Sequence, residues 1–77
     1  MKLSNLDPYE NLANAIVLDA VKDYRNALNR LKKNSRNSIA ASERDEIERF
    51  FHSPWFGVLT QVDPEYLITQ LNEEVFG

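Results

Sequence analysis

The 77-residue chain contains no cysteine, so disulfide bonds and thiolate metal sites are excluded. It has only two glycines, Gly57 and Gly77, which excludes a glycine-rich loop that cradles phosphate groups. The single histidine, His52, lies one helical turn after Glu48, but a metal site needs three or four ligands. We therefore expect neither a metal nor another cofactor.

Long apolar runs are also missing. A membrane-spanning helix needs about 20 mostly apolar residues, and no stretch of the sequence approaches that length. Residues 1–5 lack the apolar segment of a signal peptide, and the absence of cysteine fits a reducing compartment. These features predict a cytoplasmic protein that does not associate with membranes.

Groups that could catalyse a reaction are scarce. Ser53 follows His52 directly, but adjacency in sequence does not provide the geometry that a nucleophile and its base require. The acidic residues have the spacing of solvated helix surfaces, and so short a chain has little room for a water-excluding pocket. We expect no enzymatic activity.

The periodicity of apolar residues predicts an all-α domain, a three-helix bundle with a short aromatic helical turn around Ser53–Leu59. The first helix should begin at Asp7-Pro8 and end near Lys33 or Asn34, after a loose arm of residues 1–6. The second should begin at Ser38 or Ser42, with acidic residues in its first turn, and end before Pro54. The last should begin at Asp63-Pro64 and end near Val75.

Aromatic residues are concentrated in one short stretch. Three of the four phenylalanines and the only tryptophan lie within residues 50–56. Because aromatic side chains bury the largest areas, we expect this stretch, including Trp55, to form the core. The full expected core is Leu12, Ile16, Ala20, Tyr24, Leu28, Leu31, Ile47, Phe50, Phe51, Trp55, Phe56, Leu59, Leu67 and Leu71.

Charge is distributed unevenly around the net value of −3. The segment Lys22–Arg36 has six basic residues and one acidic residue, whereas Glu43–Gly77 has eight acidic and two basic residues. This asymmetry predicts one positive and one negative surface, which bears on partners rather than on fold. The acidic candidates for protein binding are Glu43, Glu46, Glu48, Glu73 and Glu74. The basic candidates for nucleic-acid binding are Lys22, Arg25, Arg30, Lys32 and Lys33.

One apolar residue breaks the pattern of the first helix. Leu18 points outward among polar side chains, although isolated exposed leucines are common in soluble proteins. It is a candidate contact for a partner or for a second copy of the chain.

Several segments resemble a group of small uncharacterised helical proteins carried by phages and mobile elements of Gram-positive bacteria. The resemblance runs over most of residues 7–75 and is most specific at the aromatic stretch. Such proteins often carry Asp or Glu at the position of Pro54 and Gly at that of Pro64. The matching segments are Asp7–Val17, Glu48–Ser53, Trp55–Phe56 and Glu65–Ile68.

This resemblance implies a setting but no functional residue. It suggests a small accessory protein of a mobile element that acts on something else in the cytoplasm of a host bacterium. Combined with the acidic surface, it favours a non-enzymatic protein that binds a host or phage protein, such as an inhibitor of a host defence nuclease. The alternatives are a small nucleic-acid-binding module that uses the basic end of the first helix, and an assembly component of a phage particle.

Overall fold

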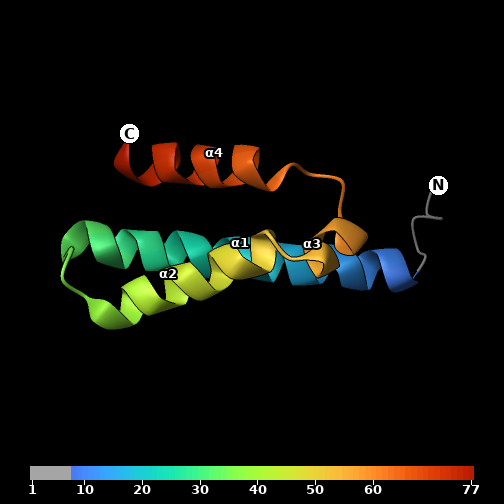
Figure 1. Ribbon diagram of the computed structural model, residues 1–77, viewed down its shortest axis with the longest axis horizontal. Coiled ribbons are helices and arrows are strands. Elements are labelled where there is room, and N and C mark those ends of the chain that lie inside the picture. Colours follow the sequence, from blue (N-terminus) through green and yellow to red (C-terminus); the bar gives the residue numbers. More distant parts are fainter. Residues whose placement is uncertain (1–7) are drawn as a thin grey trace.

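The structure is a computed structural model that describes the backbone of residues 8–77 and the side chains of residues 11–77. The predicted all-α class is confirmed, and no strand occurs among these residues. The expected N-terminal arm and the Asp7 cap lie outside the described part. In chain order (Figure 1), the helices are α1 (Pro8–Lys33), α2 (Ser38–Phe51), α3 (Pro54–Leu59) and α4 (Pro64–Phe76).

Side-chain caps fix where the three later helices begin. The Asn37 side chain accepts a hydrogen bond from the Ala40 amide at 3.0 Å, which starts α2 at Ser38. The alternative start at Ser42 is wrong, and the first turn of α2 has no acidic residue because the helix begins one turn earlier. Ser53 caps α3 and Asp63 caps α4, and each is followed by a proline at the first helical position, as predicted.

Helix α1 is the element against which the other three pack. Figure 1 shows α2 running back along α1, and α4 running in the same direction as α1. The 26 residues of α1 span about 39 Å, which accounts for most of the 46 Å length of the molecule. Among the side chains that the structure describes, the buried positions of α1 lie in its second half: Tyr24, Ala27, Leu28 and Leu31. The first half extends beyond α2 and α4 (Figure 1).

The core is a cluster of aromatic rings held between α1, α2 and α3. Phe51 packs edge-on against Tyr24 at 5.4 Å between ring centroids, and against Phe56 at 5.3 Å. Phe50 adds an edge-to-face contact with Phe56 at 5.6 Å. Leu71 and Val75 of α4 close the cluster, together with Leu28. Edge-to-face aromatic pairs stabilise a core beyond the effect of the area they bury.

Two residues expected in the core are exposed. Trp55 is 57% exposed because α3 has less than two turns and turns Phe56 inward, so its neighbour projects about 100° away. Leu12 is 59% exposed because it lies at the edge of the apolar stripe, about 120° around α1 from the buried Tyr24. Six further expected core residues are half-buried: Ile16, Ala20, Ile47, Phe50, Leu59 and Leu67. Buried residues missing from the expected core are Ala27, Ala40 and Val75.

Candidate protein-binding surface

The basic and acidic segments of the chain meet in ion pairs. Arg25 of α1 forms a two-point contact with Glu74 of α4, and Arg30 donates to Glu43 of α2 at 2.7 Å. Two of the five basic candidates therefore bind two of the five acidic candidates. The positive and negative surfaces predicted from the sequence are joined at these pairs rather than separated.

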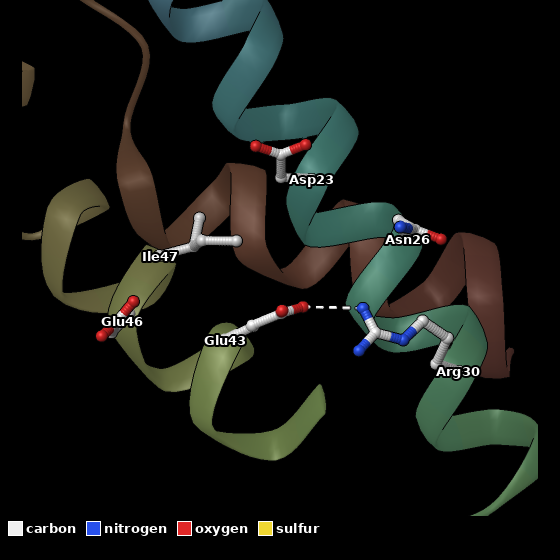
Figure 2. Close-up of a pocket in the computed structure, with 6 residues that line it drawn as sticks. All are labelled: Asp23, Asn26, Arg30, Glu43, Glu46 and Ile47. Atoms are coloured by element: carbon white, nitrogen blue, oxygen red, sulfur yellow. Dashed lines mark hydrogen bonds and ion pairs between the residues drawn. The ribbon is translucent and has the colours of Figure 1, made fainter. Parts of the chain in front are cut away.

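A groove of about 390 Å³ lies between α1 and α2, and Figure 2 shows the residues that line it. Glu43 reaches across the groove to Arg30, and Glu46 of the same helix also lines the groove (Figure 2). The remaining lining residues are Asp23, Asn26 and Ile47. Among the described residues, no three acidic or histidine side chains are arranged to hold a metal ion. The groove between α1 and α2 is therefore lined mainly by polar side chains, and the Arg30–Glu43 ion pair crosses it.

Glu48 has an internal role. Its carboxylate accepts a hydrogen bond of 2.6 Å from the Tyr24 hydroxyl, which in turn accepts one of 3.0 Å from the Asn72 side-chain amide. This chain of hydrogen bonds joins α1, α2 and α4 at the centre of the bundle. Of the acidic candidates, Glu43 and Glu46 are exposed on α2, and Glu73 and Glu74 are exposed on α4.

His52 ends α2 and ties it to the start of α4. Its Nδ1–H donates to the Glu48 carbonyl oxygen at 2.9 Å, and its Nε2–H donates to the Glu65 carboxylate. Both ring nitrogens can donate at the same time only in the protonated imidazole, so this arrangement favours the charged form of His52. The Glu65 carboxylate raises the pKa of His52, and the Glu48 carbonyl raises it further.

Replacing Glu65 with Gln should lower the pKa of His52. The contact between His52 and Glu65 stabilises the fold fully below the ordinary histidine pKa of about 6.5. This stabilisation is lost as the pH rises through the raised pKa of His52 in the folded protein. Nuclear magnetic resonance of the single histidine ring, recorded against pH, measures the pKa in both proteins. Glu73→Gln, at another exposed position of α4, is the control. Equal pKa values in the parent and Glu65→Gln would contradict the contact.

The outer side of α3 exposes large apolar side chains. Trp55 and Val58 are three residues apart and so lie on one side of the helix, with 57% and 74% of their surfaces exposed. Val62, in the link to α4, and Tyr66, in its first turn, are also exposed. We call Trp55 and Val58 the α3 patch. The sequence placed Trp55 in the core, but the cap-proline pair Ser53-Pro54 could have indicated that only one side of so short a helix faces inward.

No family model, no curated protein and no solved structure matches this chain. Within residues 8–77, none of the helices combines the length and the apolar character that a bilayer span requires.

Proposed function

We propose that this protein is a non-enzymatic, protein-binding accessory factor and that the α3 patch contacts its partner. The exposure of Trp55 carries this proposal. A tryptophan is among the residues that contribute most to protein interfaces, and a folded chain that leaves one outside its core keeps a large apolar surface for another molecule. The partner should offer an apolar pocket that accepts an indole ring.

The resemblance to proteins of phages and mobile elements supports a host or phage protein as this partner, bound in the cytoplasm of a bacterium. Inhibition of a host defence nuclease belongs to this proposal. Mimicry of nucleic acid is the less favoured mechanism, because Arg25 and Arg30 neutralise Glu74 and Glu43. The same two pairs weigh against a nucleic-acid module, since both arginines are engaged by carboxylates.

Trp55→Ala should strongly weaken partner binding without unfolding the protein. The proposal is tested by affinity capture from host lysate treated with nuclease, using the parent and this variant. Truncating a central interface tryptophan costs about 2 kcal/mol or more, which is roughly a 30-fold loss of affinity. The melting temperature should stay close to that of the parent because the side chain is exposed.

Ile39→Ala is the matched control, since Ile39 is a large exposed apolar residue on α2, away from α3. It should retain the partner. Equal capture by the parent and Trp55→Ala would reject the α3 patch. Recovery that disappears after nuclease treatment would instead favour a nucleic-acid ligand and the basic residues of α1.

A further inference from the structure

The turn between α1 and α2 lies in a stretch of the chain without acidic residues. Residues 24–42 contain no aspartate or glutamate, but they contain five basic residues. Two of these, Arg25 and Arg30, are neutralised by Glu74 and Glu43. We call the remaining three the basic tip: Lys32, Lys33 and Arg36.

The basic tip is open to solvent. Its three residues are exposed, and none of them forms an ion pair with another residue of 11–77. Figure 1 shows the turn projecting past the end of α4, whereas α3 lies towards the other end of α1. The other exposed candidates on α1, Lys22 and Leu18, are about 15 Å or more from Lys32 along the helix. The tip is therefore a separate concentration of positive charge at one end of the molecule.

Hydrogen bonds within the turn hold the basic tip in place. The Asn34 amide donates to the Arg30 carbonyl at 3.0 Å, and the Asn37 amide donates to the Asn34 carbonyl at 3.1 Å. The Asn34 side chain also accepts a hydrogen bond of 3.1 Å from the Arg36 amide. Because the turn is fixed between two helices, a ligand meets charges that are already gathered there, and the chain loses less freedom on binding.

The residues of the turn fit the phosphate groups of a polymer. Lys32 and Lys33 are consecutive on α1 and leave the helix about 100° apart, so they spread charge over its end rather than enclosing one small anion. Lysine and arginine contact phosphate oxygens without reading the sequence of bases. The exposed side chains of Asn34 and Ser35 add hydrogen-bond donors for phosphate oxygens in the same turn.

The lack of aromatic rings near the tip distinguishes between kinds of nucleic acid. Residues 25–49 contain no aromatic residue. Proteins that hold single strands without sequence preference use aromatic side chains on which successive bases stack. In a duplex the bases stack on one another, and the phosphates lie on the outside with a high density of charge. The tip therefore fits a duplex better than a single strand.

We propose that the basic tip binds the phosphate backbone of duplex nucleic acid without sequence preference. Arg25 and Arg30, which carboxylates engage, are not needed for this contact. Because the net charge of the chain is −3, the surface outside the tip repels nucleic acid and confines the contact to the tip. The contact is independent of the α3 patch, and a molecule that used both would hold its protein partner beside a duplex.

The salt dependence of binding tests this proposal. Fluorescence anisotropy of a labelled DNA duplex measures the affinity of the full chain between about 10 and about 60 mM salt. Three phosphate contacts predict that the logarithm of the binding constant falls against the logarithm of the salt concentration with a slope of about −2.7. Lys33→Gln should change the slope to about −1.8 and weaken binding at the lowest salt at least about tenfold, because one contact is lost.

Lys22→Gln is the matched control. Lys22 is an exposed lysine of the same helix and precedes Lys33 by about three turns, so the two point in nearly the same direction. This variant should keep the slope of the parent. Trp55→Ala should also bind the duplex like the parent, which separates this test from that of the α3 patch.

Three results would overturn the proposal. The first is a parent that does not bind the duplex at about 10 mM salt and about 1 mM protein. The second is an equal loss of affinity in Lys22→Gln and Lys33→Gln, which would mean that net charge matters and position does not. The third is equal or tighter binding of the single strand or of polyglutamate, and polyglutamate would indicate an acidic protein as the ligand of the tip.

Discussion

Phe51→Ala should unfold much of the protein at moderate temperature. The Phe51 ring is 1% exposed and contacts Tyr24, Phe50 and Phe56, so its removal leaves a cavity in the centre of the aromatic cluster. Truncating a buried phenylalanine costs about 3–5 kcal/mol. A chain of 77 residues has a free energy of unfolding of about 4–12 kcal/mol in total, so the loss approaches the whole stability. Urea titration followed by circular dichroism measures it.

Trp55→Ala is the contrasting case, four residues along the same chain. Its ring is larger than that of Phe51 but is mostly exposed, so we expect a change of less than about 0.5 kcal/mol, as for other surface substitutions. The sequence alone led to the opposite expectation, that truncating Trp55 destabilises a core. A large loss of stability in Trp55→Ala, or a small one in Phe51→Ala, would contradict the described packing.

Local chemistry made the helix boundaries predictable. Ser53-Pro54 and Asp63-Pro64 each combine a capping side chain with a residue that fits only the first turn, and the structure places helix starts at both. The start of α2 was ambiguous because serines occur at two positions one turn apart. Asn37 decides between them through a hydrogen bond that depends on where the preceding turn places its side chain.

Burial in α1 and α3 was harder to predict than their helicity. Helical periodicity gives the direction of a side chain, but not whether another helix lies opposite. Leu12 belongs to the apolar stripe read from the sequence, yet it is exposed, because it lies at the edge of that stripe, about 120° around α1 from the buried Tyr24. Whether Trp55 or Phe56 faces the core depends on how α3 is oriented against the other helices. That orientation is set by tertiary packing and not by the local sequence.

The sequence predicted which charged residues are candidates for binding, but not how these residues contact one another in the fold. The sequence shows which segments are acidic and which are basic, but it does not show which charged residues pair with each other. Arg25 pairs with Glu74, 49 residues farther along the chain. The role of Glu48 also depends on a contact across the bundle, with Tyr24. Sequence spacing indicates pairs within a helix, and neither of these pairs is of that kind.

Tyr24→Phe should destabilise the protein at neutral pH by about 1–3 kcal/mol, because the Asn72 amide and the Glu48 carboxylate lose the hydroxyl that lies between them. The ring and its packing against Phe51 remain, so the loss reports on the hydrogen bonds alone. Asn72 keeps a hydrogen bond of 2.8 Å to the Ile68 carbonyl, and this limits the effect. Tyr66→Phe, at an exposed position of α4, is the matched control and should be neutral.

The destabilisation caused by Tyr24→Phe should shrink in alkaline solution. Burial raises the pKa of Tyr24 well above its ordinary value of about 10, and the hydrogen bond to Glu48 raises it further. Above pH 10 the unfolded chain therefore loses a proton that the folded chain keeps, and the parent loses stability as the pH rises towards the raised pKa. Phenylalanine has no such proton, so the variant escapes this loss. Urea titrations of both proteins between about pH 7 and pH 11 should show converging stabilities. Parallel curves would mean that the hydroxyl ionises as readily in the fold as in the unfolded chain, contrary to its burial between three helices.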